Sequence, residues 1–392
     1  MSIKFVNTPS LEGMDAQITP VVGENPLCRI PSVRALYTAV SRQELMDHKP
    51  GTVQGFVLAF EEGLKNIIFA NLDCRHDHFK LVNTVAEAVR TAVEMHSQNI
   101  FVPVGTDFTD EEVSLICQGL MIGAYRFDLY KTEKSPKVRF TVYSERDYSA
   151  AVQNGKMLGE CTNLARDLVN TPGSDMTPVV LAQKAAAQAE LCGVKYEIFD
   201  EFEIEKMGMG SFLAVARGSV NPPRLIVLRY QGDPENDSTV ALVGKGITFD
   251  TGGYDIKDDE SMSTMKSDMG GAAAVIGAVL AIARAGIKAN VTAVVAACEN
   301  RVSGNAYLPG DVLRTMSGKT VEVINTDAEG RLTLIDAVTY AVQKENAFAV
   351  IDIATLTGGQ VVSLGYRYAA LISDSKVLTE MIQKASAACG EK

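Results

Sequence analysis

Hydrophobic positions in the first 144 residues follow two alternating patterns. Short apolar runs predict strands, and apolar positions repeating every three or four residues predict helices. We expect strands at the N-terminus and at 54–60, 66–71, 99–104 and 137–143, and helices at 81–96 and 110–125. Thr109, with Glu112 three residues later, is typical of a helix N-terminal cap. The alternation predicts a smaller N-terminal α/β domain over 1–144, with a largely parallel sheet.

The second half of the chain repeats this alternation on a larger scale. A helical pattern over 145–170 ends at Asn170-Thr171-Pro172-Gly173 and predicts a linker helix, although an ordinary helix of either domain fits as well. Residues 171–392 then predict a larger α/β catalytic domain whose central mixed sheet is covered by helices, because most of its strands are apolar throughout. The expected strands are 195–199, 224–230, 239–243, 290–297, 320–324 and 348–353. One expected helix begins at Pro178. The others span 201–207, 270–284, 332–343 and 376–388.

Composition narrows the class of protein. The 392 residues carry a net charge of −11, which argues against a general affinity for nucleic acid or an anionic membrane. We find no apolar run as long as a membrane span and no apolar core of a signal peptide at the N-terminus. The seven cysteines are dispersed, as expected for reduced thiols. These features predict a cytoplasmic protein that binds no membrane.

Histidine positions exclude several mechanisms. All four histidines lie in the first hundred residues, so the second half cannot hold a Ser-His-Asp triad, a Cys-His pair or an H-E-x-x-H zinc site. The cluster D-C-R-H-D-H at 73–78 is a weak candidate metal site, because H-x-H without further ordered spacing is common in polar loops. A solvated turn after a strand is the favoured interpretation of that segment.

Acidic residues of the second half form the main chemical signal. Asp250, Asp327 and Glu329 follow predicted strands, where open α/β sheets bind ligands, and Asp268 precedes a predicted helix. Four facing carboxylates would raise one another's pKa values, and divalent cations would remove that cost. Two cations bridged by carboxylates can activate water and polarise a carbonyl or phosphoryl oxygen. The pattern therefore predicts a two-metal hydrolase.

Each of these residues also has a plainer interpretation. Asp327, Glu329 and Arg331 are spaced by two, so an extended backbone would point them to one side, but an acidic loop with a surface ion pair fits too. Lys245 is either solvated or, beside cations, a neutral amine ligand. Asp268 could instead cap the helix that follows it. Lys257 is expected to stay charged and to act as an electrophile.

Three motifs together resemble the leucine aminopeptidase family of two-metal exopeptidases. They are N-T-D-A-E-G-R-L at 325–332, V-G-K-G-I-T-F-D at 243–250 and M-K-S-D-M-G-G-A-A at 265–273. The segments D-T-G-G-Y at 250–254 and M-K-S-D at 265–268 are most similar to the bacterial peptidase B branch. The resemblance covers 145–375, whereas the first domain is similar only in layout.

The resemblance implies a role for each site residue. One metal would be held by Lys245, Asp250, Asp268 and Glu329, and the other by Asp250, Asp327 and Glu329. A hydroxide between two Mn²⁺ or Zn²⁺ ions would attack the scissile carbonyl. Lys257 would stabilise the oxyanion, and Arg331 would hold a bicarbonate ion that shuttles the proton.

The family likeness also implies a substrate and an assembly. The substrates would be peptides with a free N-terminus, whose α-amine would bind a metal and Asp268. Met265, Thr355, Leu356 and Gly358 would line the first side-chain pocket and bind the peptide backbone. Family members form homohexamers.

Two alternatives to an active aminopeptidase stay open. Family catalytic domains continue past the position of Lys392, so the C-terminal part of the domain is expected to be missing. An inactive fragment or structural subunit is therefore one alternative. A two-metal phosphoesterase is the other, because paired carboxylates also serve phosphoryl transfer.

Overall fold

The computed structural model of the chain describes residues 1–61 and 63–392. The chain forms two compact units, one made of 1–163 with 359–392 and the other of 164–358. The expected division into 1–144, 145–170 and 171–392 stays a prediction.

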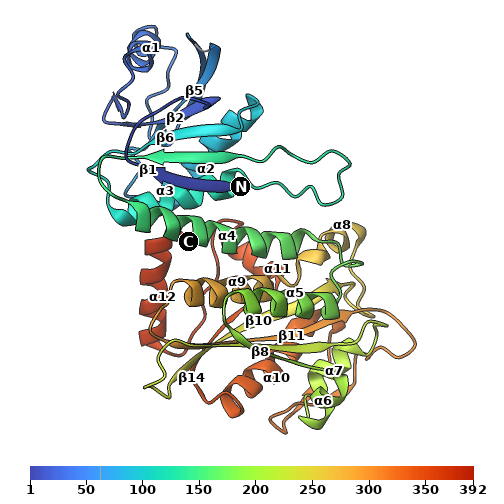
Figure 1. Ribbon diagram of the computed structural model, residues 1–392. Helices are drawn as coiled ribbons and strands as arrows, with labels where there is room; N and C mark the ends of the chain where they lie inside the picture. The colour runs from blue at the N-terminus through green and yellow to red at the C-terminus, as the bar shows by residue number, and fades with distance from the viewer. Residues whose placement is uncertain (62) are drawn as a thin grey trace. The chain divides into compact units, whose positions relative to one another are not determined.

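A largely parallel sheet forms the centre of the first unit (Figure 1). Its strand order is β1-β7-β6-β2-β5-β4, and only the edge strand β4 and the short β3 run antiparallel to their neighbours. The strands are β1 (Ser2–Val6), β2 (Ala16–Val22), β3 (Asn25–Pro26), β4 (Val53–Phe60), β5 (Gly63–Asn71), β6 (Asn99–Pro103) and β7 (Arg139–Tyr143). The helices are α1 (Pro31–Arg42), α2 (His78–Glu94), α3 (Asp110–Gly123), the first part of α4 (Ser149–Asn170) and α12 (Lys376–Cys389). The capping box of Thr109 and Glu112 at the start of α3 is confirmed.

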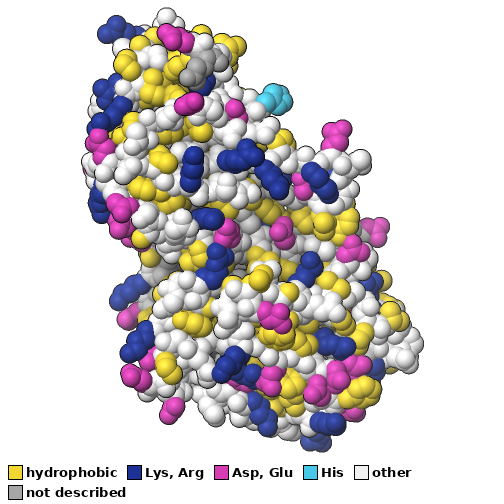
Figure 2. Space-filling model, in the orientation of Figure 1, with side chains coloured by type: hydrophobic (Ala, Val, Ile, Leu, Met, Phe, Trp, Pro, Cys, Tyr) yellow, Lys and Arg dark blue, Asp and Glu magenta, His cyan; other side chains and the backbone are white. Residues whose placement is uncertain are grey.

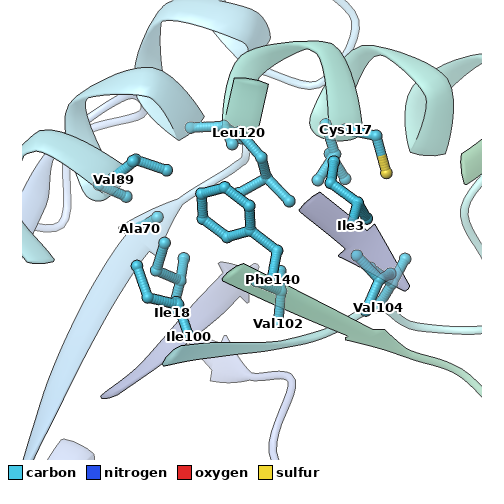
Figure 3. Close-up of a cluster of buried hydrophobic side chains, with 14 of the residues drawn as sticks. Ile3, Ile18, Ala70, Val89, Ile100, Val102, Val104, Cys117, Leu120 and Phe140 are labelled. Carbon is cyan, nitrogen blue, oxygen red and sulfur yellow. The ribbon is translucent and has the colours of Figure 1, made fainter. Parts of the chain in front are cut away.

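Alternating side chains of the strands bury both faces of this sheet. On β5, Ile68 and Ala70 belong to the core beneath α2 and α3, whereas Ile67 and Phe69 pack with Val33 of α1. Figure 3 shows the first of these cores, with Phe140 of β7 facing Leu120 of α3. The two faces explain why the strands are apolar throughout.

The hydrophobic pattern missed several elements of the first unit, among them β2 and α1. Strand β2 lies in the middle of the sheet although it contains Pro20 and buries the polar side chains of Gln17 and Thr19. Proline and polar residues argue against a central strand, so the hydrophobic pattern does not predict one there. Helix α1 begins at Pro31 and buries only three side chains.

The second unit contains the mixed sheet that the sequence predicts. Its order is β14-β10-β11-β9-β8, with β10 parallel to both neighbours and β9 antiparallel to β11 and β8. The strands are β8 (Lys195–Phe199), β9 (Arg224–Gln231), β10 (Thr239–Asp250), β11 (Asn290–Asn300) and β14 (Ala347–Ile353). The helices are α5 (Pro178–Leu191), α6 (Glu201–Lys206), α7 (Gly210–Ala216), α8 (Asp259–Ser263), α9 (Gly270–Arg284) and α10 (Glu329–Gln343). Helix α11 (Gly358–Leu364) begins at the last residue of this unit and otherwise belongs to the first.

Helices cover both faces of this sheet. Helices α5 and α9 lie on one face, and α7 and α10 lie on the other (Figure 1). The second layer buries Phe212 of α7 and Ala337 of α10 against Val243 and Val294 of the central strands. On the face of the molecule shown in Figure 2, acidic and basic side chains are interspersed.

The expected strand at 320–324 has a different role. It is shortened to β13 (Thr320–Glu322), which pairs only with β12 (Val312–Arg314) in a separate two-stranded sheet. Residues 325–331 therefore follow a hairpin rather than a strand of the central sheet.

One helical stretch meets the length and composition of a membrane span. Met265–Arg284, which includes α9, has a mean hydropathy of 1.4 over its most apolar window, and 56% of that window is buried. The stretch contains Lys266 and Asp268, so its uninterrupted apolar run is shorter than a membrane span, in keeping with the sequence prediction. Ala272 and Val275 are fully buried, and α9 packs against β10 and β11, as a core helix of a folded domain does.

Candidate metal centre

Strand β10 carries both Lys245 and Asp250. Their side chains reach the same site because a bulge interrupts the strand between them. Regular alternation would place residues five apart on opposite faces. The pairing with β11 shifts between Ile247 and Phe249, so Thr248 is an extra residue. One extra residue reverses the alternation and brings both side chains into one site.

The ammonium group of Lys245 is fully buried and has three acceptors. Its Nζ lies 2.8 Å from Asp268 Oδ1, 2.8 Å from Glu329 Oε1 and 3.0 Å from the carbonyl oxygen of Thr355. Burial alone would lower the pKa of Lys245, but the carboxylates of Asp268 and Glu329 outweigh it and raise the pKa. Gly330 is required here, because a Cβ atom would lie 2.6 Å from Lys245 Cε.

Asp327 and Glu329 approach each other through a helical turn. The prediction of an extended backbone is wrong, because Thr326–Ala328 form a 3-10 turn and Glu329 begins α10. The turn still brings the acids together: ligand oxygens of Asp250, Asp327 and Glu329 all lie within 4.8 Å of one another. Among the described residues, this is the only such group of acids, histidines or cysteines.

Asp268 does not cap the helix that follows it. Met269 occupies the cap position of α9, and no side chain caps that helix end. Asp268 instead accepts hydrogen bonds at Oδ1 from Thr355 Oγ1, at 2.6 Å, and from Lys245. The capping interpretation is therefore wrong.

The buried carboxylates have fewer donors than they can accept. Asp268 Oδ2 and Glu329 Oε2 are buried and have no hydrogen-bond partner among the described residues. Burial, more than the neighbouring acids, raises the pKa of Asp268 to about 6 and that of Glu329 to about 7. It also raises the pKa of Asp327. Orphaned carboxylate oxygens beside an acidic cluster are the donor set that a hard divalent cation needs, so these residues fit a metal centre.

Lys257 contacts two of the expected ligands, which the sequence interpretation did not anticipate. Its Nζ lies 3.0 Å from Asp250 Oδ2 and also pairs with Asp327 Oδ1. Burial would lower its pKa, but these carboxylates raise it, so Lys257 stays an ammonium. Each lysine thus pairs with two acids: Lys245 with Asp268 and Glu329, and Lys257 with Asp250 and Asp327.

The remaining predicted residues lie at different distances from this centre. Thr355 contacts Asp268 and Lys245 directly, and Met265 is half-buried in the turn three residues before Asp268. Leu356 and Gly358 are exposed and follow Thr355. Arg331 is exposed on the first turn of α10 and has no ion pair or hydrogen bond within the described part of the chain.

Sequence reasoning missed the residues that join the ligand-bearing segments. Thr326 is fully buried, and its hydroxyl and N–H bond to the loop at Gly252 and Asp255. Asn300, at the end of β11, lies opposite Asp250 and donates to it. Thr326 stands inside the octapeptide, which could have marked it, whereas Asn300 follows an apolar strand without a motif.

The segment at 73–78 forms no comparable cluster. Asp73 accepts from the N–H of Gly23, and Asp77 caps α2 by accepting from Lys80 N. His78 Nδ1 bonds to the carbonyl oxygen of Ala388. The favoured interpretation, a polar turn after β5, agrees with these contacts.

Comparisons with known proteins agree with this geometry. The family model described as "Cytosol aminopeptidase family, catalytic domain" matches residues 163–392. The probable cytosol aminopeptidase of Clostridium perfringens is 41% identical, over 96% of this chain and 80% of that protein. The probable cytosol aminopeptidase of Clostridium tetani is 39% identical, over 97% and 81%. Among solved structures, the bottromycin maturation enzyme BotP in complex with Mn is 29% identical with a TM-score of 0.83, covering 97% of this chain and 80% of that chain.

Proposed function

The chain belongs to the cytosol aminopeptidase family, a family of metal-dependent aminopeptidases, and we propose that it hydrolyses the N-terminal residue from peptides at a two-metal site. The observation that carries this proposal is that two buried carboxylates, Asp268 and Glu329, share Lys245 and each keep one oxygen with no hydrogen-bond donor among the described residues.

The proposed ligands divide into two overlapping sets. Lys245, Asp250, Asp268 and Glu329 would hold one cation, and Asp250, Asp327 and Glu329 would hold the other. When bound, the two cations would lower the pKa of a water molecule and polarise the scissile carbonyl. Their charge would also reverse the preference of Lys245 for its ammonium form and allow its amine to coordinate. Oxygen-rich ligation favours Mn²⁺, and Zn²⁺ is the other candidate.

Side chains around the cluster supply binding and charge stabilisation. We propose that the substrate's α-amine binds a cation and donates to Asp268, with Thr355 holding the carboxylate of Asp268 in place. The ammonium of Lys257 would stabilise negative charge on the carbonyl oxygen, and Arg331 would hold a bicarbonate ion that shuttles a proton. Met265, Leu356 and Gly358 would line the pocket for the first side chain.

A three-substrate assay tests the proposal. The purified protein with added Mn²⁺ is given leucyl p-nitroanilide, its N-acetylated form and p-nitrophenyl phosphate. We expect release of nitroaniline from the free amine only. Equal rates on the acetylated substrate would reject recognition of the amine, and hydrolysis of the phosphate alone would favour a phosphoesterase.

The wider properties of the protein follow from the same family membership. We propose that the protein acts in the cytoplasm, as the word cytosol in the names of its relatives suggests. We also propose that it forms a homohexamer and that its chain divides into the domains 1–144, 145–170 and 171–392. Size-exclusion chromatography with light scattering would distinguish a hexamer from smaller assemblies.

A further inference from the structure

Asn300 occupies the space between two ligand-bearing segments. Its side chain is fully buried at the end of β11, beside the last residue of β10. Its Nδ2 lies 2.8 Å from Asp250 Oδ1 and 3.0 Å from the carbonyl oxygen of Thr326. The amide group therefore links the end of a central strand to the turn that presents Asp327 and Glu329.

The chemistry of these contacts requires an amide. Both partners of Asn300 are acceptors only, so the group between them must supply two donors. An amide nitrogen does this, whereas an aspartate supplies none and a serine supplies one. The same argument fixes the orientation of the amide, because the opposite orientation would place three acceptor oxygens together.

Each acceptor is held by a second donor. Asp250 Oδ1 also accepts from the N–H of Gly252, at 2.8 Å, and the Thr326 carbonyl accepts from the hydroxyl of the buried Tyr307, at 2.7 Å. With Oδ1 held on one side, Asp250 Oδ2 is the oxygen that faces Lys257. The held Thr326 carbonyl fixes the plane of the peptide that leads into Asp327.

We infer that Asn300 is a positioning residue for the metal centre, holding Asp250 and the Thr326–Asp327 peptide in the relative arrangement that the cations require. The inference rests on the proposed function. Partners that orient metal ligands by hydrogen bonds contribute roughly 10- to 100-fold to metal affinity. Tyr307 donates only to the Thr326 carbonyl, so its contribution to metal affinity should be smaller than that of Asn300.

The matched control is a second buried asparagine. Asn163 in α4 is 6% exposed, its Nδ2 donates to the carbonyl of Met121, and its Oδ1 has no partner among the described residues. It has the same chemistry as Asn300 but belongs to the first unit. Replacing either with leucine keeps the size of the side chain and removes its polar atoms.

The experiment is a competition titration of Mn²⁺ against a chelating dye, with folding verified by circular dichroism. We expect Asn300→Leu to bind Mn²⁺ about 10- to 100-fold more weakly than wild type. Tyr307→Phe should lose less, and Asn163→Leu should bind as wild type does, even where its melting temperature falls. Wild-type affinity in folded Asn300→Leu, or equal losses in both asparagine variants, would overturn the inference.

The experiment also covers a variant that does not fold and a wild-type protein that binds no metal. Should Asn300→Leu fail to fold, Asn300→Ser decides: one donor for two acceptors predicts weakened binding, and unchanged affinity overturns the inference. A wild-type protein that binds no Mn²⁺ overturns the proposed function, and the positioning role with it.

Discussion

Two acidic segments of this protein, 73–78 and 325–331, follow β-structure and look alike in composition, but they differ in how their charges are satisfied. In the first, Asp73 and Asp77 each accept a nearby backbone N–H and stay exposed. In the second, Asp327 and Glu329 turn toward Asp250, and Glu329 is buried with an oxygen that has no donor in the part of the chain that the structure describes.

The comparison shows that acidity alone does not make a metal site. Solvent and backbone donors satisfy the acids of 73–78 at little cost. Glu329 is buried beside the half-buried Asp327 and the buried Asp250 and Asp268, and two lysines offset these four charges, which costs free energy unless cations are bound. The predictions below test whether this difference is functional.

Removing an acid from the second cluster should have the largest effect. Asp250→Ala takes away a ligand proposed for both cations, so metal and activity should be lost together. We expect the rate to fall more than about 10³-fold, since a metal's contribution to charge stabilisation is worth several kcal/mol. Elemental analysis and steady-state rates measure both effects. A variant that retained both ions and its turnover would remove Asp250 from the site.

Lys257→Ala should separate catalysis from metal binding. We expect turnover to fall about 10²- to 10³-fold, the loss typical of one removed oxyanion donor. Metal content should stay near that of wild type, because cations replace the charge that Lys257 gives to Asp250 and Asp327. Loss of metal in this variant would make Lys257 a ligand. Arg331→Ala should behave similarly with a smaller loss, since water can replace a bound bicarbonate.

The residues of this site could be predicted from the sequence better than the backbone geometry that positions them. The three sequence motifs and Lys257 contain the four acids and both lysines that the structure brings together. The extra residue in β10 that aligns Lys245 with Asp250 depends on pairing with β11, and the 3-10 turn at Thr326 depends on its bonds to Asp255. Likewise, the central position of β2 results from neighbours that cover its buried Gln17 and Thr19. Such long-range contacts leave no periodic signal in the chain.

The stability of metal-depleted protein should depend on pH. Asp268 and Glu329 have folded-state pKa values of about 6 and about 7, above their ordinary 3.8 and 4.5. The fold then binds more protons than the unfolded chain between about pH 4 and 7, so stability falls as pH rises through this range. Urea unfolding at pH 5 and pH 8, with chelator, measures the fall.

A double variant isolates the two carboxylates from other titrating groups. Asp268→Asn with Glu329→Gln should show a smaller fall in stability between pH 5 and pH 8 than wild type does. An equal fall in both proteins would show that these carboxylates do not cause it.

The smallest effect is expected in the other acidic segment. Asp77→Ala removes the cap of α2 and should cost about 1 kcal/mol of stability, the usual value for such a cap. Metal content and turnover should not change. A loss of bound metal in this variant would mean that 73–78 holds a cation, and the contrast between the two segments would disappear.

Metal stoichiometry is the most direct test of the contrast itself. Native mass spectrometry of the Mn²⁺-loaded protein should show two ions per chain, and chelation should remove both ions together with the aminopeptidase activity. Restored Mn²⁺ should recover both. Full activity in protein shown to be free of metal would contradict the account.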